Sequence, residues 1–235
     1  MQTTNSVLIN QAKESLNGKW GLAIGGFLAY YLISTSLTFI PKGGILSVLI
    51  IGGPFLLGLQ RFFLSIARNQ EVKIDEVFSG FNSFGKALGA YLLMLLYIVL
   101  WCFLLIVPGI IAAFSYSMTF FILADEPSIG VSEALNKSKQ MMNGNKWKYF
   151  LLMLPFMVIP FILLMVYLSF IAVASFNHDY VSVLKYSSIN NTVSGKLISS
   201  SIYVLLSWLF VWMYVASAKF YDDINPKEIE TALDY

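Results

Sequence analysis

The sequence predicts an all-α integral membrane protein whose six transmembrane helices form three tandem units, each an interfacial amphipathic helix followed by a two-span hairpin. Two observations lead to this fold class: 57% of the 235 residues are hydrophobic while 12% are charged, and a short amphipathic segment precedes every second apolar run. Average soluble domains have roughly a quarter charged residues. A chain this long still exposes about a quarter to a third of its unfolded surface. With a mean hydropathy of +0.72, that surface requires lipid.

Apolar runs of sufficient length set the number of spans, since a membrane-spanning helix needs ~20 apolar residues. We take residues 1–235 as a single polytopic membrane domain. Its predicted spans are approximately 20–40, 44–67, 87–107, 108–124, 147–175 and 196–221. No Lys, Arg, Asp, Glu or His occurs at 87–124, 149–177 or 197–218. These charge-free stretches carry the prediction.

The distribution of charge predicts the orientation, because cytoplasmic loops retain Lys and Arg. With the N-terminus inside, only Lys42, Lys185 and Lys196 of the 15 basic residues lie outside. We therefore expect both termini in the cytoplasm. The polar segment before the first span predicts an uncleaved anchor rather than a signal peptide. Nearly all the acidic residues share the cytoplasmic face, which argues against a polybasic lipid-binding patch and against nucleic-acid binding.

Three amphipathic segments, at 5–18, 74–86 and 130–143, are expected to lie in the cytoplasmic interface. The last is the clearest, because Val131, Leu135 and Met142 share one face. Glu133 lies in its first turn, where the helix dipole favours an anion, and Gly144 follows as a C-terminal cap. The first segment ends in the same Asn-Gly pair. Trp20 and Trp147, each beside a lysine, fit the aromatic belt at the headgroups.

Prolines and glycines mark breaks and close contacts within the spans. Pro54 interrupts the second span, where a kink is expected for structural reasons. Pro108 and Gly109 predict a tight turn between the third and fourth spans. The pairs Gly21/Gly25 and Gly85/Gly89 predict close helix packing within the chain.

Residues able to perform chemistry are scarce. One cysteine, Cys102, and one histidine, His178, exclude an internal disulfide and a histidine-pair site. The predicted spans contain almost no ionisable residues, and no catalytic or phosphate-binding motif occurs. The acidic pairs at 125–126 and 222–223 are interpreted as solvated helix ends rather than metal ligands. We therefore predict no catalytic residue, no cofactor, no metal and no enzymatic activity.

Motifs between Val107 and Lys148 resemble a known family. They are Val107–Ala112, Ser115–Met118, Phe121–Asp125, Ile129-Gly130, Glu133–Leu135, Ser138-Lys139, Met142–Gly144 and Lys146–Lys148. Together they resemble the bacterial integral membrane family catalogued as domain of unknown function 975. The arrangement is also similar to the membrane domain of some glycerophosphoryl diester phosphodiesterases. The resemblance implies a six-span protein of the bacterial inner membrane and supplies no reaction or site residue. The stretch 176–195 is longer than the family pattern.

Two functions follow as hypotheses. The first is a non-catalytic membrane protein that acts through a membrane-protein partner, as a transporter accessory, an envelope-stress component or a peptide-immunity protein. The alternative is a small transporter or pore with its pathway between the helical hairpins. The prolines within the second and fifth predicted spans favour it. An enzyme would need its chemistry at the interfacial carboxylates. The lipid bilayer is a partner of the protein whether it is an accessory protein, a transporter or an enzyme.

Overall fold

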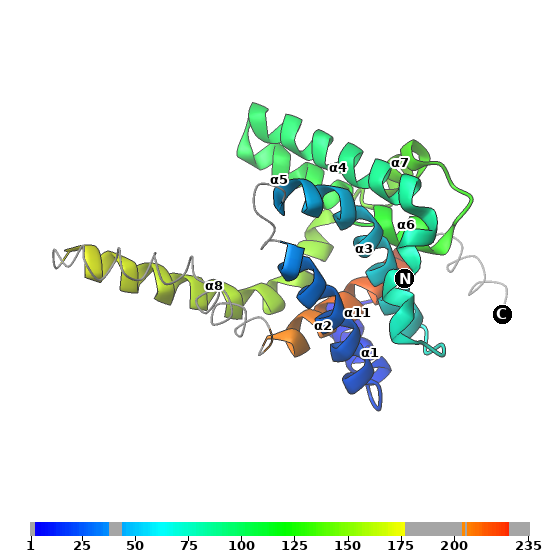
Figure 1. The fold of residues 1–235 in the computed structure, drawn as a ribbon, viewed down its shortest axis with the longest axis horizontal. Coiled ribbons are helices and arrows are strands. Elements are labelled where there is room, and N and C mark those ends of the chain that lie inside the picture. Colours follow the sequence, from blue (N-terminus) through cyan, green and yellow to red (C-terminus); the bar gives the residue numbers. More distant parts are fainter. Residues whose placement is uncertain (1–2, 38–43, 177–203, 205, 226–235) are drawn as a thin grey trace. The chain divides into compact units, whose positions relative to one another are not determined.

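The computed structural model describes residues 3–37, 44–176, 204 and 206–225, and the elements in this part of the chain are helices (Figure 1). They are α1 (Asn5–Ser15), α2 (Trp20–Leu37), α3 (Gly44–Ala67), the 3₁₀ helix η1 (Ile74–Ser83), α4 (Phe84–Leu104), α5 (Ile106–Ser115), α6 (Thr119–Asp125), α7 (Val131–Met141), α8 (Lys146–Phe176) and α11 (Ser207–Ile224). The chain divides into two compact units. The first comprises residues 1–152 and 211–235, and the second residues 153–210.

Four stretches of helix are long and apolar enough to cross a membrane. They are Leu49–Ala67, Ile74–Leu104, Ile106–Asp125 and Lys146–Leu163. These correspond to the second to fifth predicted spans, and α3 and α8 each continue through their prolines. The stretch 176–195 lies almost wholly outside the described residues, as do the end of the first predicted span and the beginning of the sixth.

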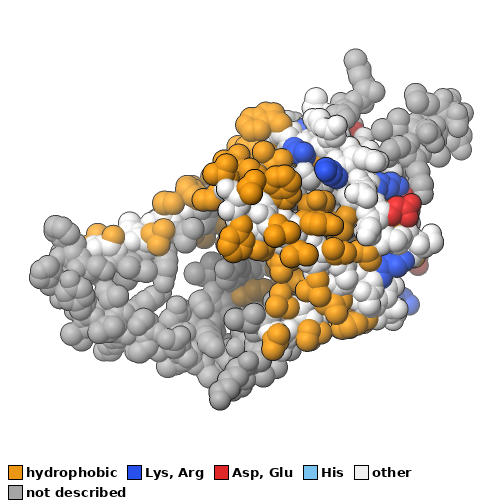
Figure 2. Space-filling model, turned by 90° about the horizontal axis from the view of Figure 1, so that it is seen from above, with side chains coloured by type: hydrophobic (Ala, Val, Ile, Leu, Met, Phe, Trp, Pro, Cys, Tyr) orange, Lys and Arg blue, Asp and Glu red, His pale blue; other side chains and the backbone are white. Residues whose placement is uncertain are grey.

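The core of the first unit forms around α3, whose Leu57, Phe62 and Phe63 are fully buried. The ring of Phe63 stacks on Tyr214 of α11 with centroids 4.9 Å apart. The apolar side chains of α4 and α5 are exposed by contrast, up to 86% at Phe103. Figure 2 shows this apolar surface in orange beside an end where charged side chains gather. Ion pairs join Arg68 to Asp125 and Asp222, and we call the end of the first unit that carries these residues the charged end.

Backbone-to-backbone contact joins η1 to α3. A Cβ atom on Gly58 would lie 2.0 Å from the carbonyl oxygen of Val77, and one on Gly80 would lie 1.9 Å from that of Pro54. Only glycine permits so close an approach. The ring of Phe55 caps the contact, edge-on to Phe81 at 5.0 Å. The predicted amphipathic helix at 74–86 is thus a 3₁₀ helix that ends at Ser83.

The turn between α4 and α5 lies at Leu105, whose backbone is extended (φ −166°, ψ 150°). The sequence placed this turn at Pro108 and Gly109, which instead belong to α5. Proline is well tolerated in the first turn of a helix, where its missing N–H has no partner to lose. Gly109 is needed for another reason, since a Cβ there would lie 2.1 Å from Sγ of Cys102.

Gly109→Ala is therefore expected to destabilise the protein by about 1–3 kcal/mol, the usual cost of overpacking. In a Cys102→Ala background the nearest remaining atoms are the Cα and Cβ of residue 102, at 3.0 and 3.1 Å, so most of the loss should be recovered. Thermal unfolding in mild detergent measures both variants. Equal losses in the two backgrounds would show that α4 and α5 do not meet at this contact.

The two 11-residue helices α1 and α7 have the same local structure, shifted by 126 residues from Asn5 to Val131. Their N-caps have nearly the same backbone (φ −72°, ψ 152° and φ −73°, ψ 154°). The buried positions also correspond: Leu8, Ala12, Ser15 and Leu16 match Ala134, Ser138, Met141 and Met142. The predicted apolar face of α7 is confirmed at Leu135 and Met142, which are buried.

The turns that follow α1 and α7 are equivalent too. Gly18 and Gly144 both have a left-handed backbone, at φ +75° and +80°, as expected for a glycine that ends a helix. The next helices then begin at Trp20 and Lys146. Trp147 is thus one residue beyond the position of Trp20, and one residue turns a helix by about 100°. This offset accompanies a difference in exposure, since Trp20 is half-buried and Trp147 is 68% exposed.

Candidate functional site

Arg68 lies at the charged end, directly after α3, with its guanidinium between two carboxylates. It donates to Oδ1 of Asp125 at the end of α6 from Nη1 at 2.5 Å. It donates to Oδ1 of Asp222 in the last turn of α11 from Nη2 at 2.7 Å and from Nε at 3.2 Å. One side chain thus ties together the ends of three helices. We call Arg68, Asp125, Asp222, Tyr221 and Asn225 the Arg68 cluster.

Asp125 is the acceptor at the centre of this cluster. Its Oδ2 accepts a hydrogen bond from the hydroxyl of Tyr221 at 3.0 Å and from the side-chain amide of Asn225 at 3.3 Å. Asn225 is buried. The amide of Asn225 also donates to the hydroxyl of Tyr221, at 3.3 Å, so the three side chains form a closed network.

The electrostatics explain why a cation is needed here. Asp125 and Asp222 stand at helix C-termini, where the helix dipole disfavours a negative charge, and Arg68 follows a C-terminus that favours a positive one. Burial alone would lower the pKa of Arg68, but hydrogen bonds to Asp125 and Asp222 outweigh burial and raise it above its ordinary value. The guanidinium therefore stays charged at any physiological pH. The Arg68 cluster thus holds the ends of α3, α6 and α11 together throughout that range.

A second ion pair lies at the same end. Asp223 accepts from Nζ of Lys148 at 2.6 Å and from both the backbone N–H and the hydroxyl of Thr3, at 3.0 and 2.5 Å. These contacts, which we call the Asp223 clamp, join the N-terminal segment to α8 and α11. Burial would raise the pKa of Asp223, but the hydrogen bonds from Lys148 and Thr3 lower it on balance.

The lowered pKa makes the clamp sensitive to acid. A carboxyl whose pKa falls on folding stabilises the protein above its unfolded pKa, and this contribution is lost as the pH falls through the folded value. Asp223→Asn should therefore lower the Tm by a constant amount from pH 7 to pH 5, and the difference should shrink below about pH 4. Thermal unfolding of both proteins across this range measures the effect. A difference that is undiminished at pH 3 would contradict it.

The polar face of α7 borders an open groove of about 530 Å³ at the charged end. Glu133, Asn136 and Gln140 line it with exposed side chains. Lys137 also lines it and is held by an ion pair to Glu126. The opposite face of α7 is buried, and the hydroxyl of Ser138 donates to the carbonyl of Ser115 at 2.8 Å. The groove thus has a fixed wall rich in hydrogen-bonding groups.

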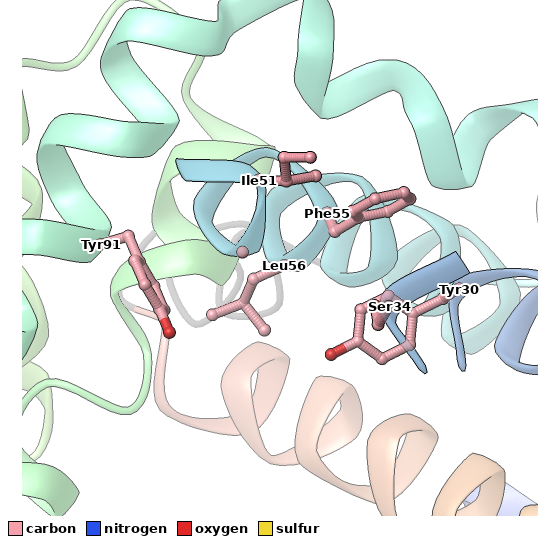
Figure 3. Close-up of a pocket in the computed structure, with 7 residues that line it drawn as sticks. Tyr30, Ser34, Ile51, Phe55, Leu56 and Tyr91 are labelled. Carbon is pink, nitrogen blue, oxygen red and sulfur yellow. The ribbon is translucent and has the colours of Figure 1, made fainter. Parts of the chain in front are cut away.

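A smaller cavity of about 120 Å³ lies between α2, α3 and α4 (Figure 3). Apolar Ile51, Phe55 and Leu56 form much of its wall. Tyr30 and Tyr91 flank it, and Ser34 adds a second kind of hydroxyl. Gly52 leaves room for the ring of Tyr91, which a Cβ there would approach to 3.2 Å. Gly52 lies two residues before Pro54, which the sequence marked as a break.

The residues singled out in the sequence do not form one site. Pro54 packs on η1 through its carbonyl, Pro108 and Gly109 lie in the α4–α5 hairpin, and Gly144 ends α7. Glu133 belongs to the α7 groove, while Trp147 stacks on Phe150 with ring centroids 5.2 Å apart.

The acidic pairs were interpreted incorrectly from the sequence. Asp125, Glu126, Asp222 and Asp223 each form an ion pair, with Arg68, Lys137, Arg68 and Lys148 respectively. Their exposure alone shows that they are not free helix ends, since the side chain of Asp223 is only 10% exposed. A basic residue beside the end of another apolar run, as at Arg68, was the signal that could have paired them. Within the described residues, no group of three or more His, Cys, Asp or Glu side chains could hold a metal.

Comparison with known proteins adds a family. A family model described as "Protein of unknown function (DUF975)" matches residues 1–112 and 103–228. No curated protein and no solved structure matches the chain.

Proposed function

The chain belongs to the DUF975 family of proteins of unknown function, and from this premise we propose that it is a six-span protein of the bacterial cytoplasmic membrane that works by holding a partner protein at its cytoplasmic face. It does so without chemistry of its own. The observation that carries the proposal is α7, whose buried face is fastened to the bundle while its polar face borders an open groove.

The six-span arrangement rests on the order of the helices. Besides the four stretches long and apolar enough to span, α2 and α11 each have 18 residues. The short helices α1, η1 and α7 each precede a pair of longer helical stretches. The likeness of α1 to α7 supports tandem units that enter the membrane from one side. The charged end then faces the cytoplasm, in keeping with the retention of basic residues there.

A protein partner suits the α7 groove better than a small ligand. Sites for small molecules are enclosed and mostly apolar. This groove is open, and Glu133, Asn136 and Gln140 offer it hydrogen-bonding groups. Such polar, accessible surfaces form the rims of protein interfaces.

Photo-crosslinking in native membranes tests the docking. A crosslinking residue at Asn136 or Gln140 should capture the same protein. One at Ser132, which is exposed on the same helix but does not line the groove, should capture little. Glu133→Lys should abolish the adducts while lowering the Tm by only a few °C, because its side chain is exposed and the lost stabilisation is its interaction with the helix dipole. Equal capture from Ser132, or none from the groove, would overturn the proposal.

Cysteine labelling after Cys102→Ala tests the orientation separately. Single cysteines at Asn69, Asn136 and Lys227 should react only with a permeant reagent, whereas those at Lys42 and Lys185 should react with an impermeant one from outside. Labelling of Asn136 from outside would overturn the six-span arrangement.

A small transporter or pore is the second candidate, favoured by the cavity of Figure 3. The polar groups of the cavity are the hydroxyls of Tyr30, Ser34 and Tyr91. A pathway through it would therefore carry uncharged solutes rather than ions. Release of encapsulated small polyols from vesicles measures this. A pathway through the cavity predicts that Ser34→Phe slows release, and no release above protein-free vesicles would exclude it.

A further inference from the structure

A second groove, of about 290 Å³, follows α5 along the first unit. Trp101, Pro108 and Ile111 line its apolar part, and Lys139, Lys146 and Tyr116 line its other part. Trp101 and Ile111 are 47% and 48% exposed, so the groove opens onto the apolar surface of α4 and α5. One depression thus combines an apolar trough with two cations.

The two lysines differ from the other basic groups nearby. Arg68, Lys137 and Lys148 are ion-paired with carboxylates, and Lys86 donates to the carbonyl of Pro127. The side-chain ammonium groups of Lys139 and Lys146 make no hydrogen bond or ion pair with any residue that the structure describes. The near-neutral balance of the charged end therefore conceals a local excess of two positive charges.

The apolar part of the groove is long enough to hold much of an acyl chain. From Pro108 to Ser115, α5 rises ~10 Å at 1.5 Å per residue. Half of the ~30 Å hydrocarbon core is ~15 Å. The apolar part of the groove therefore matches about two-thirds of the thickness of one leaflet. A molecule that fills it needs an anionic head and an apolar tail.

We propose that this groove binds one anionic phospholipid. Its phosphate lies between Lys139 and Lys146, where the hydroxyl of Tyr116 is available as a further donor, and one acyl chain runs along Pro108 and Ile111 to Trp101. Two ammonium groups complement one phosphate, and the apolar lining excludes a free hydrophilic anion from most of the groove. The site rests on the membrane embedding proposed above and is independent of the α7 groove.

Tryptophan quenching by brominated lipid tests the site. The full chain is reconstituted in phosphatidylcholine vesicles that contain increasing fractions of phosphatidylglycerol with brominated acyl chains. Quenching should saturate at a few mol% of this lipid, and a share of it should disappear in Trp101→Phe. Lys139→Gln with Lys146→Gln should raise the half-quenching fraction about 30-fold, from the usual attraction of a lysine to an anionic lipid surface.

The control Lys13→Gln with Lys19→Gln removes the same charge from α1 and the turn after it, and should shift the half-quenching fraction less than threefold. Brominated phosphatidylcholine should quench only in proportion to its abundance. Equal quenching by the two lipids, an equal shift in the control, or unchanged quenching in Trp101→Phe would each overturn the lipid site. A protein that fails to enter vesicles at all would instead overturn the membrane embedding of the proposed function.

Discussion

Arg68→Ala is expected to lower the free energy of unfolding by about 3 kcal/mol, the lower end of the cost of breaking a buried ion pair by removing one partner. The side chains of Arg68, Asp125 and Asp222 are 22%, 18% and 21% exposed, so water screens them only in part. Without the guanidinium, Asp125 and Asp222 face each other at helix C-termini, and both the dipoles and their mutual repulsion act against the fold. The Tm in mild detergent should fall by roughly 10 °C.

Two further variants separate charge from geometry at Arg68. Arg68→Lys keeps the charge but cannot bridge both carboxylates with a rigid fork, so it should recover part of the loss. Lys13→Ala removes one exposed cation from α1 and should change the Tm by less than about 2 °C, as surface substitutions usually do. If Arg68→Ala lost no more than Lys13→Ala, the cluster would not fasten α3, α6 and α11.

Gly80→Ala is expected to cost about 3 kcal/mol or more, the upper range for overpacking. The new Cβ would lie 1.9 Å from the carbonyl oxygen of Pro54 and 2.8 Å from the backbone nitrogen of Gly58. These are backbone atoms and cannot rotate aside, so η1 must move off α3. The packing of Phe55 against Phe78 and Phe81 would then be lost with it. The Tm and the yield of monodisperse protein measure the effect.

Gly85→Ala is the matched control, since a Cβ there would meet nothing within 4 Å. It lies in the first turn of α4, where alanine is favoured over glycine by up to about 1 kcal/mol, so the Tm should stay the same or rise. A Gly80→Ala protein as stable as Gly85→Ala would show that η1 does not rest on α3.

The sequence predicted the helical fold class and the apolar face of α7, because hydrophobic content and helical spacing are local properties. It misplaced the close contacts. Cβ atoms on Gly21 and Gly85 would meet nothing within 4 Å in the described residues, whereas Gly58, Gly80 and Gly109 are in tight contact. A spacing of four along one helix says which glycines share a face, but the partner that uses the face lies elsewhere in the chain.

The partners in the ion pairs could not be predicted for the same reason, although the position of Arg68 beside the end of an apolar run was a signal for such a pair. Asp125 and Asp222 end different helices, and only the packing of α6 and α11 beside α3 brings them to Arg68. Counting charges along the chain gave an almost neutral end. The structure shows that neutrality arises from specific pairs, which is why Lys139 and Lys146 stand out once Arg68, Lys137 and Lys148 are assigned.

The separation in sequence between hydrogen-bonded residues determines which contacts can form first during synthesis. The hydrogen bonds of the turn at Leu16–Lys19 reach back only three or four residues, so it can form while later segments are still in the ribosome. Arg68 is joined to residues 57 and 154 positions further on. Until α11 has been synthesised, Asp222 is missing, and the ends of α3 and α6 meet around an incomplete cluster. The last of the described helices, α11, therefore completes the Arg68 cluster, and a chain truncated before it should be recognised and degraded as unfinished.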